Sequence, residues 1–247
     1  MSKTAIVTGA SSGIGAATAG ALRRAGFEVV LGARRQQPLE DTASAIGARC
    51  HPLDVTDAAS VAAFCAHLEE VHLLVNNAGG AWGLDAVESA SDERWEWMYR
   101  TNVLGTLAMT RQLLPKLVAS GDGQIVNVGS TAGFEVYPGG AGYTAAKHAL
   151  RALTGTLRLE LLGQPVRVTA VNPGLVETEF SLVRFDGDAE RAAAVYAGMN
   201  PLTAEDVAEC IAWAATRPSH VNIDEIVVRP RDQATSTQVH REPPPTP

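Results

Sequence analysis

The sequence predicts a doubly wound α/β protein, in which helices cover both faces of one mainly parallel, seven-stranded sheet. Three observations lead to this prediction. Short apolar runs alternate with helix-favouring segments along most of the chain, which is typical of parallel βαβ units. A glycine-rich turn follows the first apolar run directly. The chain has 247 residues, of which 46% are hydrophobic and 19% charged, as expected for one soluble domain with a substantial core.

The first half of the chain contains four predicted strands. Residues 5–7 form an apolar run, and the Ala-rich segment 14–24, which is followed by Gly26, favours a helix. The same alternation then continues with strands at 27–31, 49–53 and 73–75 and helices at 38–45 and 57–69.

The second half begins with a long helical region over 92–118, with Pro115 near its end. The elements that follow are strands at 124–128, 166–171 and 223–228 and helices at 142–162 and 203–216. We expect residues 1–230 to form a single domain. Residues 231–247 differ in composition and end in a proline-rich stretch, so they are interpreted either as a frayed tail or as an arm that contacts another subunit.

Charge and residue usage exclude several classes of protein. A net charge of -7 argues against a surface that binds nucleic acid, and no apolar run reaches the roughly 18 residues of a membrane span. The three cysteines are far apart, and the histidines show no metal-ligand spacing. The chain enters its first strand without room for a signal peptide. We therefore expect a cytoplasmic protein with no metal, no nucleic-acid partner and no membrane partner.

The turn after the first strand has the composition of a phosphate-binding loop. Glycines permit a tight turn and the close approach of a pyrophosphate, while a helix N-terminus offers free N–H groups. The spacing is G-x3-G-x-G, which differs from the G-x-G-x-x-G fingerprint of many dinucleotide-binding proteins. Its position between a strand and a helix favours dinucleotide binding over a purely structural turn. The candidate residues are Gly9, Ser11, Ser12, Gly13, Ile14 and Gly15.

The end of the second strand predicts which dinucleotide is bound. NAD-specific domains carry an acidic residue there, which accepts hydrogen bonds from the ribose 2′-hydroxyl. This chain has Arg34 and Arg35 instead. Two guanidinium groups favour a 2′-phosphate and therefore NADP. The alternative is a pair of solvated surface arginines.

Tyr143 and Lys147 form a candidate acid/base pair. They are four residues apart in a predicted helix, so their side chains share one face. A nearby ammonium favours the phenolate and should lower the pKa of Tyr143 from its usual value of about 10. Ser130 follows a predicted strand, at the edge where open α/β sheets hold their ligands. Together these groups suit proton exchange with an alcohol or carbonyl oxygen.

At this point the chain resembles the short-chain dehydrogenase/reductase family, over nearly its whole length. The resemblance rests on the glycine turn, Asp54-Val55, Asn76-Asn77-Ala78-Gly79, Asn102, Ser130, Tyr143-x3-Lys147 and Asn172-Pro173-Gly174. It implies a Rossmann-type fold in which Tyr143 exchanges the proton and Ser130 polarises the substrate oxygen. Lys147 would lower the pKa of Tyr143 and hold the nicotinamide ribose, and Asn102 would anchor a water-linked proton relay through Lys147.

The resemblance also implies the remaining cofactor contacts. Asp54 and Val55 would contact the adenine, and Asn77 would lie along the cofactor. Pro173, Gly174 and Val176 would flank the nicotinamide.

The second half is similar to a narrower group, the NADP-dependent 3-hydroxy acid dehydrogenases, also called serine dehydrogenases. Segments 173–185, 201–209 and 219–223 carry this similarity, which implies a small 3-hydroxy acid as substrate and a homotetramer. Residues 134–137 depart from that group. A ketone, aldehyde or dicarbonyl reductase therefore remains an alternative, as does a non-catalytic NADP sensor. Arg184 is either a clamp for a substrate carboxylate or an exposed or intersubunit arginine on a mobile loop.

Overall fold

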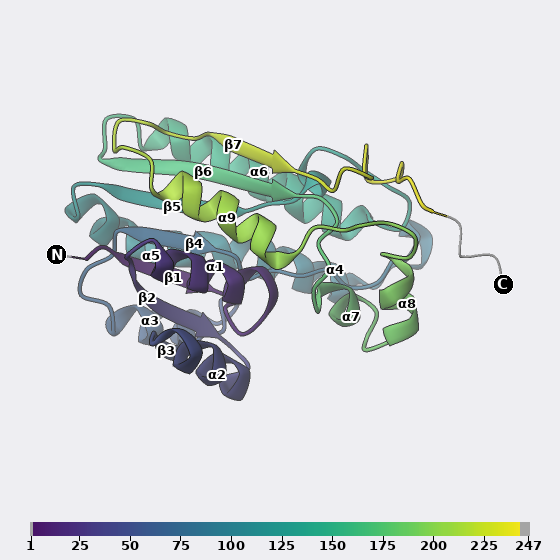
Figure 1. Cartoon of the computed structure of the whole chain (residues 1–247), viewed down its shortest axis with the longest axis horizontal. Coiled ribbons are helices and arrows are strands. Elements are labelled where there is room, and N and C mark those ends of the chain that lie inside the picture. The colour runs from purple at the N-terminus through teal and green to yellow at the C-terminus, as the bar shows by residue number, and fades with distance from the viewer. Residues whose placement is uncertain (1, 243–247) are drawn as a thin grey trace.

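Seven parallel strands form one sheet in the computed structural model, which describes residues 2–242 of the chain (Figure 1). Their order is β3-β2-β1-β4-β5-β6-β7. The strands are β1 Thr4–Thr8, β2 Glu28–Ala33, β3 Arg49–Pro52, β4 Leu73–Asn76, β5 Gly123–Val128, β6 Val166–Pro173 and β7 Glu225–Val228. Each neighbouring pair is parallel. This topology confirms the predicted doubly wound fold.

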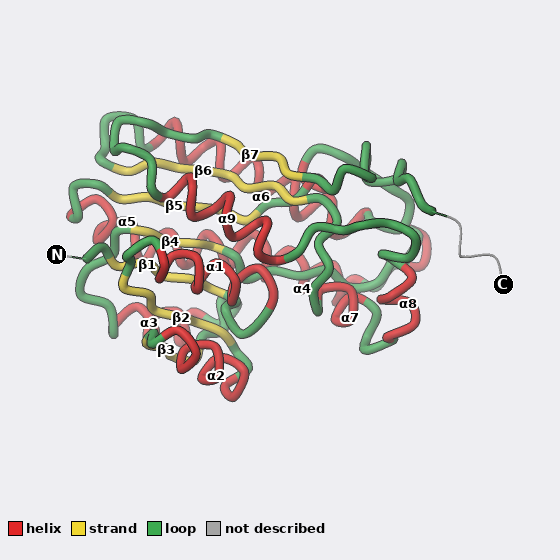
Figure 2. The backbone as a smooth tube through the Cα atoms, viewed as in Figure 1, coloured by secondary structure: helices red, strands yellow, loops and turns green. Residues whose placement is uncertain are grey.

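Helices cover both faces of the sheet (Figure 2). One face carries α1, α2 and α9, and the other carries α3, α5 and α6. The helices are α1 Gly13–Arg24, α2 Gln36–Ile46, α3 Ala58–Ala66, α4 Asp92–Tyr99, α5 Gly105–Ala119, α6 Ala141–Glu160, α7 Phe180–Arg184, α8 Ala189–Ala194 and α9 Ala204–Ala215, with 3-10 turns at Val87–Ser89 and Thr131–Gly133. Within the described residues, no helix combines the length and the apolar character needed to cross a membrane.

Most of the core lies in two apolar layers separated by the sheet, and a third, smaller cluster contains Ala81, Met98, Ala132 and Tyr143. Val7 of β1 packs into the layer shared with α1 and α9, whereas its neighbour Ile6 packs into the layer shared with α3 and α5. Both side chains are fully buried. A strand that is covered on both faces needs apolar residues at consecutive positions. This double burial explains why strands such as β1 and β4 are recognisable in the sequence as continuous apolar runs, whereas the edge strands β3 and β7 are only partly buried.

The structure differs from the prediction at two places in the helices. The region predicted as one helix over 92–118 contains a π-helical turn at Arg100–Leu104, which separates α4 from α5. The short helices α7 and α8 were not predicted, because five and six residues are too few to display a helical period.

The segment after β7 does not fray within the described residues. Gln233 is buried, and its side-chain oxygen accepts a hydrogen bond from the Leu175 amide at 2.8 Å. Ser236 donates to the Glu135 carboxylate from both its amide and its hydroxyl. Of the two interpretations of 231–247, the frayed tail does not describe residues 231–242. Residues 243–247 lie outside the described part of the chain.

Candidate active site

The glycine turn after β1 packs tightly against the loop after β4. Gly9 has φ +66°, a conformation that favours glycine. A Cβ on Gly15 would lie 2.3 Å from the Gly9 carbonyl oxygen and 2.5 Å from Asn77 Nδ2. The Asn77 amide in turn donates to the carbonyls of Thr8 and Gly9 at 2.9 and 3.1 Å. The turn therefore presents bare backbone at the N-terminus of α1, in the form that a pyrophosphate requires.

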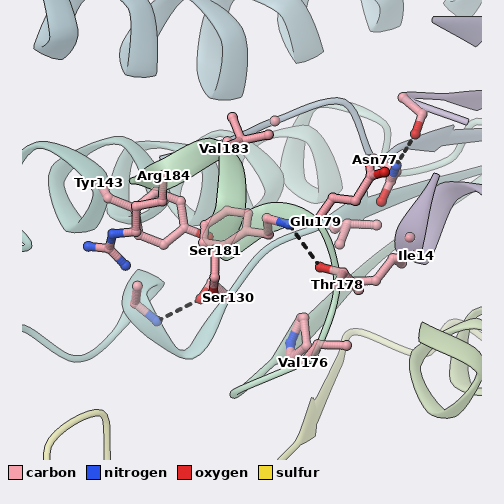
Figure 3. Close-up of a pocket in the computed structure, with 18 of the residues that line it drawn as sticks. Ile14, Asn77, Ser130, Tyr143, Val176, Thr178, Glu179, Ser181, Val183 and Arg184 are labelled. Carbon is pink, nitrogen blue, oxygen red and sulfur yellow. Dashed lines mark hydrogen bonds between the residues drawn. The ribbon is translucent and has the colours of Figure 1, made fainter. Parts of the chain in front are cut away.

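A cavity of about 590 Å³ runs along the carboxyl edge of the sheet from this turn to Tyr143, and its volume is within the usual range for ligand sites. Figure 3 shows Ile14 and Asn77 at one end, Ser130, Tyr143 and Arg184 at the other, and Thr178 and Glu179 between them. The sequence-predicted residues that line it are Gly9, Ser11, Ser12, Gly13, Ile14, Arg34, Arg35, Asp54, Val55, Asn77, Ser130, Tyr143, Lys147, Pro173, Gly174 and Val176. Gly15 and Asn102 do not line the cavity but lie behind residues that do.

The two arginines after β2 lie beside the serines of the glycine turn. Arg35 Nη2 donates to Ser12 Oγ at 2.7 Å and to Ser11 Oγ at 3.2 Å, and it pairs with Glu179 Oε2 at 2.8 Å. Arg34 is exposed and lines the same end of the cavity. Two guanidinium groups and two hydroxyls at one place form a donor set suited to a phosphate.

Ser130, Tyr143 and Lys147 meet at the other end of the cavity. Ser130 follows β5, and its hydroxyl accepts a hydrogen bond from the Ala132 amide at 3.1 Å. Tyr143 and Lys147 lie on α6 and are buried. Lys147 Nζ donates to the Val128 carbonyl at 3.0 Å and lies 5.7 Å from the centroid of the Tyr143 ring. The fold therefore brings together three groups that come from two separate elements.

Burial dominates the ionisation of this cluster. It raises the pKa of Tyr143 above its usual value, while a hydrogen bond with Ser130 and the nearby Arg184 guanidinium lower it. Burial also lowers the pKa of Lys147 to about 8. The expectation that Lys147 depresses the pKa of Tyr143 is not met here, because desolvation outweighs the nearby charges. Arg184 is the cation whose charge lowers the pKa of the phenol.

Asn102 lies in the π-helical turn and is almost fully buried. Its amide nitrogen donates to the carbonyls of Gly80 and Met98, each at 2.8 Å. These bonds hold the loop after β4 against the helix. π-helical turns inside α-helices often occur at functional sites, so the position of Asn102 is compatible with a supporting role behind Lys147.

Residues 177–188, which we call the lid segment, line the cavity from Glu179, beside Arg35, to Arg184 at the catalytic end. The Phe180 ring packs against the Tyr143 ring with centroids 5.6 Å apart. Arg184 Nε donates to the Gly83 carbonyl at 3.0 Å, and Arg184 Nη2 donates to the Tyr137 hydroxyl at 3.2 Å. The Arg184 guanidinium lies 5.8 Å from the Tyr143 ring centroid. Arg184 thus faces the cavity and is not an isolated surface arginine.

Sequence reasoning missed two features of this end. Tyr137 lies in the stretch that departs from the 3-hydroxy acid dehydrogenase pattern, but the sequence did not indicate that its hydroxyl would contact Arg184. The sequence also gave no sign of the contacts of Trp82, whose ring nitrogen donates to Asp186 Oδ1 at 2.5 Å and whose ring lies 5.1 Å from the Arg94 guanidinium. Both contacts join residues that are far apart in the chain, so no local pattern could have predicted them.

Known proteins match the chain along most of its length. A family model described as short chain dehydrogenase matches residues 3–187. An uncharacterised oxidoreductase of Mycobacterium tuberculosis is 61% identical, with 96% of this chain and 94% of that protein covered. An NADP-dependent 3-hydroxy acid dehydrogenase of Schizosaccharomyces pombe is 41% identical, with 97% and 96% covered.

A solved structure described as the closed form of serine dehydrogenase complexed with NADP+ has a TM-score of 0.92 and 40% identity, with 97% of this chain and all of that chain (100%) covered. The agreement in sequence, fold and length confirms the resemblance derived from the motifs. The chain belongs to the short chain dehydrogenase family.

Proposed function

We propose that the protein interconverts a secondary alcohol and a carbonyl compound by hydride transfer with NADP(H), and that Tyr143 exchanges the proton. The observation that carries the proposal is the meeting of Ser130, Tyr143 and Lys147 in the cavity that begins at the glycine turn. The S. pombe relative is an NADP-dependent 3-hydroxy acid dehydrogenase, and the serine dehydrogenase structure is a complex with NADP+, which supports this choice of cofactor.

The residues of the cavity fit a dinucleotide that carries a 2′-phosphate. The bare turn around Gly9 and Gly15 has no room for a side chain and would receive the pyrophosphate, while Arg34 and Arg35 would bind the 2′-phosphate. Asp54 and Val55 would contact the adenine, Asn77 the middle of the cofactor, and Pro173, Gly174 and Val176 the nicotinamide. When bound, the nicotinamide donates or accepts the hydride.

The proton chemistry falls to this chain's own side chains. Because burial raises its pKa, the Tyr143 phenol stays protonated near neutral pH and can donate to a carbonyl oxygen on which negative charge develops. Ser130 hydrogen-bonds the same oxygen and holds it near the phenol. Lys147 would bind the nicotinamide ribose and pass protons towards the relay that Asn102 supports.

Arg184 supports a small 3-hydroxy acid as the substrate. Its described hydrogen bonds use Nε and Nη2, so among residues 2–242 its Nη1 has no partner and is available to a carboxylate. Its position over the Tyr143 ring would place that carboxylate next to the reacting carbon. The names of the relatives, 3-hydroxy acid dehydrogenase and serine 3-dehydrogenase, agree with this choice.

The apolar part of the wall favours a second candidate substrate class. Leu84, Trp97 and Phe180 line the cavity close to the catalytic end, and such a surface accommodates neutral ketones and aldehydes. A carbonyl reductase of broad specificity would use the same Ser130, Tyr143 and Lys147.

An assay of NADP reduction and NADPH oxidation over a panel of 3-hydroxy acids, neutral alcohols and carbonyl compounds tests these alternatives. Arg184→Gln should raise KM for 3-hydroxy acids more than KM for neutral alcohols. Arg24→Gln, at the exposed end of α1 and outside the cavity lining, makes the same charge change and serves as the control. Equal effects of Arg184→Gln on both substrate classes would exclude the clamp. Absence of turnover across the panel, with NADPH bound, would favour a sensor.

The proposal includes a cytoplasmic homotetramer. Leu159 and Leu162, at the end of α6 and just after it, are 78% and 87% exposed, which is consistent with a surface that packs against another subunit. Sedimentation of the purified protein measures the oligomeric state directly, and a monomer at micromolar concentration would contradict this part of the proposal.

A further inference from the structure

Glu179 of the lid segment lies in the anion-binding corner formed by Arg35 and the glycine turn. Arg35 Nη2 is 2.8 Å from Glu179 Oε2 and 2.7 Å from Ser12 Oγ. The two partners of the ion pair are separated by 144 positions in the chain, and their side chains are 49% and 51% exposed. Figure 3 shows Glu179 in the middle of the cavity, between its two ends. A carboxylate of the protein itself therefore uses the donors that suit a phosphate.

The contacts of Glu179 keep it negatively charged. The Arg35 guanidinium and the Ser12 hydroxyl hold the pKa of Glu179 below its usual range. A phosphate monoester also carries close to two negative charges at neutral pH. Two anions at one place repel each other. Arg35 Nη2 already donates to Ser11 and Ser12, so it cannot also donate to both the Glu179 carboxylate and a phosphate.

We propose that Glu179 and the 2′-phosphate of the cofactor compete for Arg35, so that the phosphate displaces Glu179 and releases the near end of the lid segment. This inference rests on the proposed assignment of Arg34 and Arg35 to NADP. Glu179 then acts as a specificity-determining residue, because it lowers the affinity for 2′-phosphorylated cofactors and leaves the affinity for unphosphorylated ones unchanged.

The structure shows how this release reaches the catalytic end. Phe180, the residue after Glu179, packs on the Tyr143 ring. The far end of the lid segment is held separately, by Arg184 on the Gly83 carbonyl and by Asp186 on Trp82 and Arg94. Loss of the Glu179 contact therefore frees residues 178–180 at the near end, while the Glu177 amide stays bonded to the Leu202 carbonyl and Ser181 to the Tyr196 hydroxyl. The far end remains attached. Half-exposed ion pairs are weak, which makes the exchange of one anion for another feasible.

Binding of two nucleotides to Glu179→Gln tests the competition without turnover. The probes are adenosine 2′,5′-bisphosphate, which carries the 2′-phosphate, and adenosine 5′-monophosphate, which lacks it. Titration calorimetry should show that Glu179→Gln binds the bisphosphate about fivefold to tenfold more tightly than wild type, because one like charge near the phosphate is gone. Affinity for the monophosphate should not change. Glu177→Gln, an exposed glutamate in the same segment, is the matched control and should bind both probes like wild type.

Hydrogen exchange of the amides at 177–185 provides the second readout. In wild type the bisphosphate should speed this exchange and the monophosphate should not. Without any nucleotide, Glu179→Gln should already exchange these amides faster than wild type does. If Glu179→Gln binds the bisphosphate no tighter than wild type, Glu179 does not compete, and the proposal is overturned. If wild type itself does not prefer the bisphosphate to the monophosphate, the NADP assignment fails and the competition fails with it.

Discussion

The two regions that enclose the candidate site are held by different kinds of contact. Along the sheet edge, functional groups follow strands whose register is set by backbone ladders: Gly9 comes after β1, Ser130 after β5 and Gly174 after β6. The lid segment 177–188 contains one short helix, α7. Two backbone hydrogen bonds attach it to the rest of the molecule, from the Glu177 amide to the Leu202 carbonyl and from the Gly83 amide to the Arg184 carbonyl. Its other attachments come from side chains, in Arg35–Glu179, Arg184–Gly83 and Trp82–Asp186.

Because of this difference, we expect the sheet edge to determine the reaction and the lid segment to determine ligand access and affinity. Backbone ladders buried between two apolar layers open only when the sheet itself opens, so the edge keeps its geometry. Exposed ion pairs contribute about 0–1 kcal/mol each, so the lid segment can rearrange while the edge stays intact. Substitutions at the edge should therefore abolish or redirect the reaction, and substitutions in the lid segment should alter access and affinity.

The largest effect is expected for Tyr143→Phe, at the edge. Removal of the hydroxyl takes away the proton donor, and kcat should fall by about 10³-fold. NADPH affinity, measured by fluorescence titration, should be unchanged. Tyr196→Phe removes a hydroxyl that bonds Ser181 and the Val176 carbonyl beside the lid segment, and it should reduce kcat far less. A wild-type kcat for Tyr143→Phe would refute the role of the phenol.

A second edge effect follows from the buried Lys147, whose pKa is lowered to about 8 in the folded protein. Because the unfolded lysine binds its proton up to about pH 10.4, the unfolded state holds more protons in this window and stability rises with pH. Between pH 7 and 10 the free energy of unfolding of wild type should rise by about 2–3 kcal/mol relative to Lys147→Met.

Urea unfolding at several pH values measures this difference. Lys3→Met, at an exposed lysine, is the control and should parallel wild type. If the curves of wild type and Lys147→Met are parallel too, Lys147 does not titrate in this window.

A smaller edge effect is expected for Arg34→Asp, which should shift cofactor preference towards NAD. Loss of a charged hydrogen bond to the 2′-phosphate costs about 2 kcal/mol, so the ratio of kcat/KM for NADP to that for NAD should fall about 30-fold. Arg24→Asp makes the same charge change on an exposed part of α1 and should leave the ratio as it is. An unchanged ratio for Arg34→Asp would mean that Arg34 is only a solvated surface residue.

The smallest effect concerns the lid segment. Asp186 has φ +53°, which alanine tolerates poorly and asparagine tolerates better. Asp186→Ala should therefore speed hydrogen exchange at 180–188 about fivefold, equivalent to about 1 kcal/mol, whereas Asp186→Asn should have a smaller effect. Equal exchange in the two variants would show that the ion pair with Arg94, and not the backbone conformation, holds this end.

The same contrast explains what the sequence could predict. The buried strands were recognisable because double burial demands continuous apolar runs, and the residues at their carboxyl ends were therefore placed at one edge. The proximity of Tyr143 to Lys147 followed from helical spacing. The contacts of Glu179, Tyr137 and Asp186 were not predictable, because they depend on long-range side-chain geometry that no periodicity encodes.

The direction in which the pKa of Tyr143 shifts could not be predicted from the spacing of residues in the sequence. The spacing from Lys147 correctly placed an ammonium near the phenol, at 5.7 Å from the ring centroid. It did not reveal how far α6 and the Phe180 ring bury the hydroxyl. Desolvation depends on the whole packed environment, and in this site it decides the direction of the shift.

Transfer of deuterium from NADPH labelled at the reactive carbon of the nicotinamide tests directly whether the protein transfers a hydride to a carbonyl compound. The labelled cofactor would be incubated with the panel of carbonyl compounds, and mass spectrometry would locate the label in the product. We expect deuterium on the carbinol carbon with wild type and almost none with Tyr143→Phe. Tight binding of NADPH without transfer of label to any member of the panel would contradict this expectation.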